Sequence, residues 1–189
     1  GISYGISQVS LNSGNLGKLL KEYAQRASQT NRHLLAPYLD DALRMASRLN
    51  SDNNFYNLLK QFSDDPVMHQ CQEDYFDINF WQPAISWGNK NGFGVALSYG
   101  VIYDSMIHGA LNKIADAVIE DNPFHGGDEK EWLKQYVQTR RAWLAEKKPP
   151  LCNTVYRMDA FLELIKADNW NLDLPIKIRG INITEGDLK

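Results

Sequence analysis

Three charged side chains and one histidine interrupt rows of apolar residues that repeat at helical spacing. In segment 94–121 the row is broken by Asp104 and His108, and the rows of two later segments each contain one arginine, Arg140 and Arg157. Burying a lone charge is costly, so buried charges of opposite sign are expected to meet. Because a carboxylate can accept bidentate hydrogen bonds from guanidinium groups, the pattern predicts an ion network of Asp104, Arg140 and Arg157. The alternative is that each helix is rotated so that its charge reaches solvent.

The other reactive side chains indicate structural roles. His108 is interpreted as a core histidine with satisfied ring nitrogens rather than as a catalytic group. No other His, Cys or carboxylate falls at the spacing of metal ligands, so we expect neither a metal site nor a cofactor. Cys71 and Cys152 are far apart in sequence and are interpreted as plain buried thiols, with a single disulfide left open.

Helical periodicity positions these residues and makes this a mainly α protein. We expect helices near residues 15–30, 33–49, 52–63, 66–87, 94–121, 128–147 and 153–167. Asp52, Asp65 and Asp128 mark helix starts, and Asp128 has capping-box spacing to Glu131.

Both ends of the chain depart from the helical pattern. Residues 1–13 combine Gly, Ser and β-branched residues, which suit a strand and a tight turn. Isoleucines alternate around Arg179 and Gly180, which predicts a short C-terminal hairpin.

Composition excludes several functional classes. The 189 residues, 43% of them hydrophobic, fit one compact domain or one domain of two lobes. A formal charge of −3 implies no general attraction to nucleic acid or anionic lipid. No apolar run approaches the roughly 20 residues that cross a bilayer, and residues 1–8 lack the pattern of a signal peptide. Because the chain opens on Gly1 without a Met, it is interpreted as a processed or excised fragment.

Ordered motifs along nearly the whole chain carry a family resemblance. The sequence resembles the chitosanase-like glycoside hydrolase family 46 branch of the lysozyme superfamily, and related peptidoglycan-hydrolase modules of bacterial toxins and phage proteins. The motifs are residues 67–70, 80–84, 103–109, 126–129 and 171–175, with Arg140 and Arg157. The resemblance implies a single lysozyme-like catalytic domain over residues 1–189. Its expected fold is α+β, a helical bundle of two lobes with a small β-hairpin at the cleft.

The resemblance also assigns roles. Residues 1–8 match the second strand of the active-site hairpin. Ser3 takes the position of a threonine that places the attacking water. Gly5 and Ile6 keep the family's pattern of turn and strand. Tyr4, Gln8 and Asn15 are the expected substrate-binding residues, and the ion network supports the active cleft. Exposed aromatics such as Tyr4, Trp81 and Trp87 are candidates for stacking on sugar rings.

Relatives of this kind are inverting glycosidases with two carboxyl groups, a general acid and a general base. Both are expected upstream of Gly1, so this chain is expected to lack the N-terminal segment with the catalytic Glu. The alternative is a degenerate homologue. Glu22, Glu73, Asp74 and Asp77 are interpreted as surface charges rather than as substitutes.

The position of Asn15 favours one polymer over another. The family carboxylate that pairs with a free sugar amine aligns with Asn15, and an amide suits an N-acetylated sugar or a lactyl ether better. The sequence therefore predicts a peptidoglycan-cleaving, lysozyme-type activity, with a chitosanase as the alternative and an inactive carbohydrate-binding homologue as the second. The expected partners are peptidoglycan or another amino-sugar polymer, with an immunity protein or upstream effector domains. The expected location is outside the cell or the bacterial periplasm and cell wall, as for an antibacterial effector.

Overall fold

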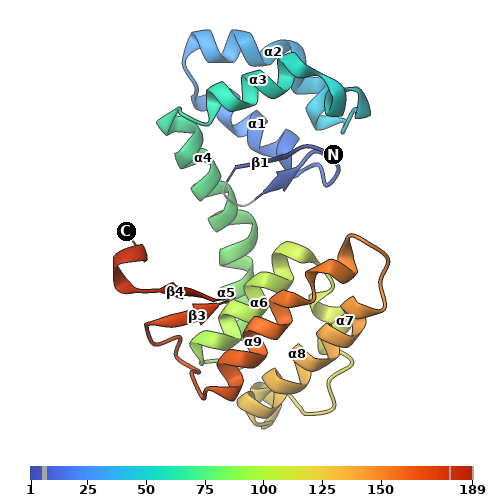
Figure 1. The fold of residues 1–189 in the computed structure, drawn as a ribbon, viewed down its shortest axis with the longest axis vertical. Helices are drawn as coiled ribbons and strands as arrows, with labels where there is room; N and C mark the ends of the chain where they lie inside the picture. The colour runs from blue at the N-terminus through green and yellow to red at the C-terminus, as the bar shows by residue number, and fades with distance from the viewer. Residues whose placement is uncertain (6–7, 179, 189) are drawn as a thin grey trace. The chain divides into compact units, whose positions relative to one another are not determined.

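The computed structural model describes residues 1–5, 8–178 and 180–188, and divides the chain into two compact units, Gly1–Asn79 and Phe80–Lys189. Helices dominate both units, and each unit contains one pair of short antiparallel strands (Figure 1). The predicted mainly α fold with two small hairpins is confirmed. Ile6, Ser7, Arg179 and Lys189 lie outside the described residues, so the predicted roles of Ile6 and of the Arg179 turn are not described further.

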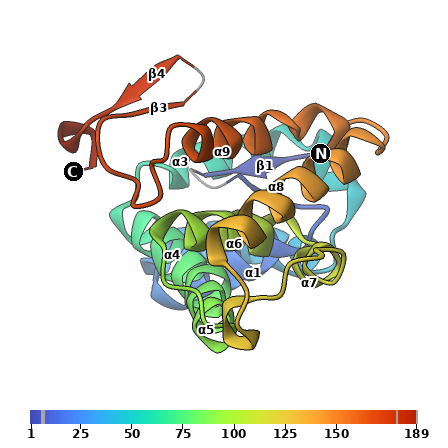
Figure 2. The same cartoon turned by 90° about the horizontal axis from the view of Figure 1, so that it is seen from below.

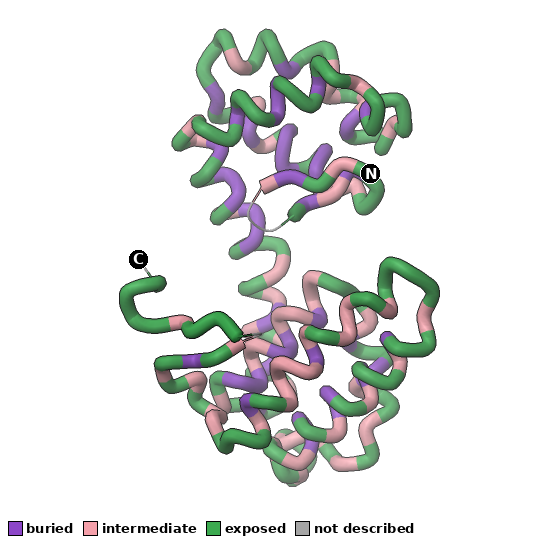
Figure 3. The backbone as a smooth tube through the Cα atoms, in the orientation of Figure 1, coloured by how far each residue is buried: buried purple, intermediate pink, exposed green. Residues whose placement is uncertain are grey.

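The first unit pairs a small hairpin with four helices. Its elements are β1 Ser3–Tyr4, β2 Val9–Ser10, α1 Asn15–Arg26, α2 Gln29–Leu43, the 3-10 helix η1 Ser47–Ser51, α3 Asn53–Phe62 and α4 Pro66–Phe76. Buried residues gather along one face of α1 (Figure 3). The Tyr23 hydroxyl of α1 donates to the Asp65 carboxylate at 2.6 Å, and the Asn31 side chain of α2 donates to both. One part-buried polar cluster thus connects α1, α2 and the start of α4.

The second unit is built on helices that surround an aromatic and aliphatic core. Its elements, preceded by the π-helical turn η2 Asp77–Trp81, are α5 Gln82–Lys90, α6 Ala96–His108, α7 Leu111–Ala115, η3 Pro123–His125, α8 Glu129–Ala145, η4 Leu151–Thr154, α9 Tyr156–Lys166, β3 Ile176–Ile178, β4 Ile181–Ile183 and η5 Glu185–Leu188. The rows Leu97 and Val101 of α6 and Leu133 and Val137 of α8 are fully buried. The terminal hairpin of β3 and β4 is visible in Figure 2. Its register pairs Ile176 with Ile183.

The three predicted helix starts are confirmed. The side chains of Asp52, Asp65 and Asp128 each accept a hydrogen bond from a backbone N–H in the first turn of α3, α4 and α8. Only half of the predicted capping box forms, because the backbone N–H of Asp128 donates to Glu120 at 2.9 Å instead of to Glu131.

Several predicted helix boundaries are wrong. The segment 94–121 is two helices rather than one, because Gly109 and Ala110 have φ values of 80° and 67°, which interrupt helical hydrogen bonding. The segment 66–87 forms α4 and α5 with η2 between them. The predicted start at residue 33 is four residues late, because Ser28 caps α2 by accepting from the Asn31 N–H at 3.2 Å.

Candidate active site

The hairpin of the first unit places the predicted water-positioning residue at the surface. Ser3 pairs with Ser10 and Tyr4 with Val9, and the Ser3 side chain is exposed. Gly5 has φ of 75°, and a Cβ there would collide with the Gln72 side chain. The positive φ therefore favours glycine directly after the strand that carries Ser3.

Gln8 closes the turn of this hairpin. Its backbone N–H and its side-chain Nε2 both donate to the Gly5 carbonyl, at 3.1 and 2.9 Å. Gln8 is exposed with φ of 54°. Its described hydrogen bonds are therefore internal to the turn.

Tyr4 is a core residue of the first unit, which corrects the prediction that its ring is exposed. Its exposed fraction is 7%, and its hydroxyl is buried without a hydrogen-bond partner among the described residues. Burial, with the carboxylates of Asp64 and Asp65, raises the pKa of the Tyr4 phenol above its ordinary value. In this structure the buried ring offers no open face to a sugar.

Asn15 lies at the start of α1 and is tied to the hairpin through serines. Its side-chain oxygen accepts from the Tyr75 hydroxyl at 3.1 Å. Its backbone N–H donates to the Ser13 hydroxyl, which in turn contacts the Ser10 hydroxyl at 3.0 Å. The structure therefore brings Ser3, through its strand partner Ser10, and Asn15 into one connected part of the first unit.

A hollow of about 230 Å³ opens beside Ser3. The hairpin contributes Ile2, Ser3, Tyr4 and Gly5 to its lining, and the remaining residues come from α3 and the turn after it: Tyr56, Leu59, Lys60 and Ser63. The Ser3 hydroxyl can both donate and accept hydrogen bonds. Ser3 is therefore chemically able to hold a water molecule at this surface.

The second unit brings together the three charges predicted from the apolar rows. Asp104 of α6 lies 2.8 Å from Arg157 Nε of α9 and 3.8 Å from Arg140 Nε of α8. The Arg140 side chain is fully buried, and the side chains of Asp104 and Arg157 are 12% and 16% exposed. The expected bidentate hydrogen bonds are not formed among the described residues, since Asp104 Oδ2 and the Nε atoms of both arginines have no hydrogen-bond partner there.

The break between α6 and α7 contributes to this ion network. Arg140 Nη1 donates to the Gly109 carbonyl at 2.9 Å. Gly109 has the positive φ that ends α6, so the helix end supplies an acceptor to a buried guanidinium group. His108 Nε2 lies 3.7 Å from Asp104. Partial burial of the ring and the charges of both arginines lower the pKa of His108, and the Asp104 carboxylate opposes this shift. The 43% exposed side chain of His108 corrects its interpretation as a core residue.

Glu129 anchors the start of the helix that carries Asp104, a role that the sequence did not reveal. Its carboxylate accepts from the backbone N–H groups of Gly94 and Val95, at 3.0 and 2.8 Å, and from the buried Ser98 hydroxyl at 2.7 Å. A carboxylate from α8 thereby caps the N-terminus of α6, where the helix dipole favours negative charge.

Replacing Glu129 with Ala is expected to lower the free energy of unfolding by about 1–3 kcal/mol, because it leaves the N–H groups and the Ser98 hydroxyl without an acceptor. Chemical denaturation of the full chain measures this. Glu146→Ala, which removes an exposed carboxylate from the other end of α8, is the matched control. An equal effect of the two variants would contradict the capping role.

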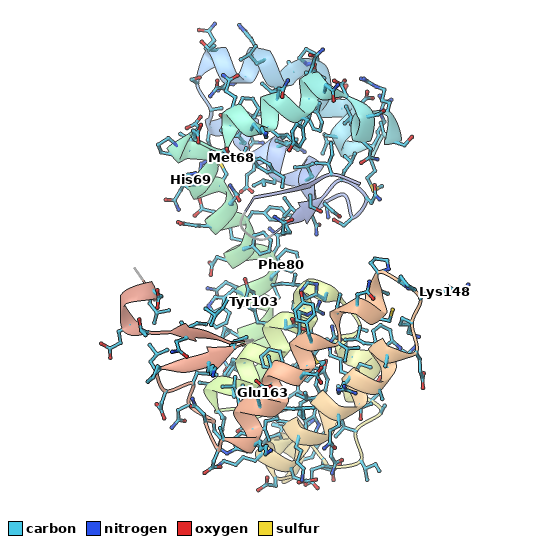
Figure 4. All side chains as sticks on the ribbon, in the orientation of Figure 1. Met68, His69, Phe80, Tyr103, Lys148 and Glu163 are labelled. Carbon is cyan, nitrogen blue, oxygen red and sulfur yellow. The ribbon has the colours of Figure 1, made fainter. Side chains whose placement is uncertain are left out.

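The remaining candidates separate into core and surface. Trp81 is 38% exposed and meets the Tyr103 ring edge-on at 5.2 Å; Tyr103 is labelled in Figure 4. Trp87 is half-buried and stacks on Phe93, so of the predicted stacking residues Trp81 is the one that the structure leaves exposed.

The Asp74 carboxyl is unsuited to proton donation. Hydrogen bonds from the Arg26 guanidinium and, to a smaller extent, from the Gln70 side chain lower its pKa.

The two cysteines, Cys71 and Cys152, are free thiols, the first buried and the second half-buried. Within residues 1–5, 8–178 and 180–188, His, Cys, Asp and Glu side chains form no group of three suited to a metal ion. The part of the chain that the structure describes contains no helix long and apolar enough to span a bilayer.

Comparison with known proteins gives one consistent group. The family model of Glycosyl hydrolase family 46 matches residues 1–176. A chitosanase from Bacillus subtilis (strain 168) is 27% identical over 164 residues, which cover 77% of this chain and 59% of that protein. The chain therefore spans about three fifths of the length of this relative.

Solved structures show the same fold. A family 46 chitosanase from Gynuella sunshinyii in complex with chitotetraose matches with a TM-score of 0.82 at 22% identity, over 97% of this chain and 83% of that chain. A mutant chitosanase from Bacillus subtilis MY002, complexed with 6 GlcN, matches with a TM-score of 0.78 at 23% identity, over 95% and 82%.

Proposed function

This chain belongs to glycosyl hydrolase family 46, and from that premise we propose that it is a chitosanase, a glycosidase that hydrolyses the β-1,4 bonds of chitosan. The match of the family model to residues 1–176 carries the proposal. The relatives described above support it, since each is named a chitosanase and two are solved with amino-sugar oligomers. This proposal replaces the preference for peptidoglycan, which rested on Asn15 and on the resemblance of residues 3–8 to peptidoglycan-hydrolase modules.

The proposed mechanism is direct displacement by water with inversion at the sugar carbon. A general acid protonates the leaving oxygen while a general base activates water on the opposite face, with the two carboxyls about 6.5–9.5 Å apart. We assign neither carboxyl to a residue of this chain. Ser3 is proposed to hold the attacking water through its exposed hydroxyl, and the ion network to fix α6, α8 and α9 as a rigid support.

Measurement of new reducing ends tests the substrate. The full-length protein is incubated in parallel with fully deacetylated chitosan and with purified peptidoglycan. The proposal predicts reducing ends from chitosan. Reducing ends from peptidoglycan alone would restore the lysozyme-type hypothesis, and polymer binding without hydrolysis of either would identify an inactive carbohydrate-binding homologue. Because both polymers are too large to cross a membrane, the proposal includes action outside the cytoplasm.

The Asn15 amide is the observation that still favours an acetylated substrate. If chitosan is cut, Asn15→Asp is expected to lower the KM for it by about fivefold, because a new carboxylate can pair with a sugar ammonium group for about 1 kcal/mol. The substituted oxygen can still accept from the Tyr75 hydroxyl, and an acid in the first turn suits α1. Steady-state kinetics measure the change, with Asn53→Asp at the start of α3 as the control. An unchanged or higher KM would contradict a role for this position in amine recognition.

A further inference from the structure

A second hollow lies in the first unit between α2 and α3, which are neighbours in Figure 1. Its volume is about 430 Å³, within the range of small-ligand sites. Four residues of each helix line it, and none of the eight is Lys, Arg, Asp or Glu. His33 is the one basic residue of this lining, which offers no carboxylate to a cationic ligand.

Amide side chains form one wall of the hollow. Asn54, Asn57 and Gln61 lie on one face of α3, three and four residues apart, and all are exposed. Each amide offers two N–H donors and a carbonyl acceptor. Among the described residues these side-chain groups make no hydrogen bond, because the one bond that involves Asn54 uses its backbone N–H. Three donor and acceptor groups therefore remain available to a ligand.

The opposite wall and the floor are largely apolar. The half-buried Tyr38 ring packs on Phe55 with a centroid distance of 5.3 Å, and Leu58 is 8% exposed beside it. Pro37, inside α2, has no N–H, so the His33 carbonyl lacks its usual helical donor. His33 also lines the hollow, on the α2 side opposite the amide wall.

We propose that this α2–α3 hollow is an accessory binding site for N-acetylated units of an amino-sugar chain. An acetamido group carries one donor and one acceptor, which match the side-chain amides, and its methyl group suits the floor of Tyr38 and Leu58. A free amine is cationic and finds no carboxylate in this lining. The inference rests on the proposed function in taking the polymer to be an amino-sugar chain, but it does not require hydrolysis.

The accessory site is separate from the hairpin. Tyr56 and Leu59 of α3 line the hollow beside Ser3, whereas Asn54, Asn57 and Leu58 line the α2–α3 hollow. The two hollows share no residue. Substitutions in the α2–α3 hollow therefore leave the lining around Ser3 intact.

Side-chain amide resonances in a ¹⁵N–¹H correlation spectrum of the full chain test this site. Titration with tetra-N-acetylchitotetraose is expected to shift the NH2 signals of Asn54, Asn57 and Gln61, and fully deacetylated chitotetraose is expected to shift them at least about tenfold more weakly at equal concentration. In Asn57→Ala/Gln61→Ala the apparent Kd for the acetylated tetramer is expected to rise about tenfold. Asn53→Ala, an exposed change on the same helix outside the hollow, is the control that keeps the wild-type Kd.

Absence of shifts with the acetylated tetramer, or equal shifts with both tetramers, would overturn the accessory site. Retained affinity in the double variant would also overturn it. Because the readout is binding, these results are independent of whether chitosan is hydrolysed. A protein that binds the acetylated tetramer here but cuts no chitosan would refute the proposed function and leave this site standing.

Discussion

Asp104→Ala is expected to lower the free energy of unfolding by about 3–5 kcal/mol, the largest stability effect that we predict. The substitution removes the carboxylate that faces Arg140 and Arg157, at 3.8 and 2.8 Å. Arg140 is fully buried, and its Nη1 donates to the Gly109 carbonyl. A buried guanidinium without a counter-charge retains its desolvation penalty, which is why removing one partner costs more than the pair itself contributes.

The chain contains a matched exposed pair for comparison. Arg141 and Asp159 also join α8 to α9, but their side chains are 45% and 46% exposed. Asp159→Ala is expected to cost less than about 1 kcal/mol, because solvent screens an exposed ion pair. Urea denaturation of both variants measures the difference. Equal losses in the two variants would show that burial of the ion network does not determine its contribution.

Ser3→Ala is expected to lower kcat on chitosan by roughly 100-fold, while KM and stability change little. Loss of the hydroxyl leaves the attacking water without a fixed position, and misplacement of a reacting group by about 1 Å costs on this order. Ser3 is exposed on β1, so the substitution removes no buried packing. Steady-state kinetics and thermal unfolding of the same preparation separate catalysis from folding.

Ser3→Thr is the control for this prediction. It keeps the hydroxyl and adds a β-branched carbon that suits a strand, so it is expected to retain activity within a few-fold of the original. If Ser3→Ala were as active as Ser3→Thr, Ser3 would have no part in positioning water.

Features that depend on neighbouring residues were predictable from the sequence. Asp52, Asp65 and Asp128 act on backbone N–H groups two or three residues away, so their types and positions suffice to mark helix starts. The meeting of Asp104, Arg140 and Arg157 is the one tertiary contact that was predictable, because buried charges on separate helices need partners.

Other features that depend on tertiary geometry were not predictable. The apolar row continues from α6 into Leu111 and Ile114 of α7, both buried, so periodicity hid the break at Gly109; that glycine was the available signal. A two-residue strand gives no periodicity to show that Tyr4 faces the core. Glu129 caps a helix more than 30 positions away in the chain, and no local pattern encodes such a contact.

The most direct test follows the hydrolysis of a fully deacetylated glucosamine hexamer by ¹H NMR, with the full-length protein and with Ser3→Ala in parallel. We expect new reducing ends whose α-anomer appears before the β-anomer, because inversion at a β-linked carbon yields the α product first, and a rate roughly 100-fold lower for Ser3→Ala. An intact hexamer under conditions in which the same preparation releases reducing ends from peptidoglycan would contradict the assignment as a chitosanase.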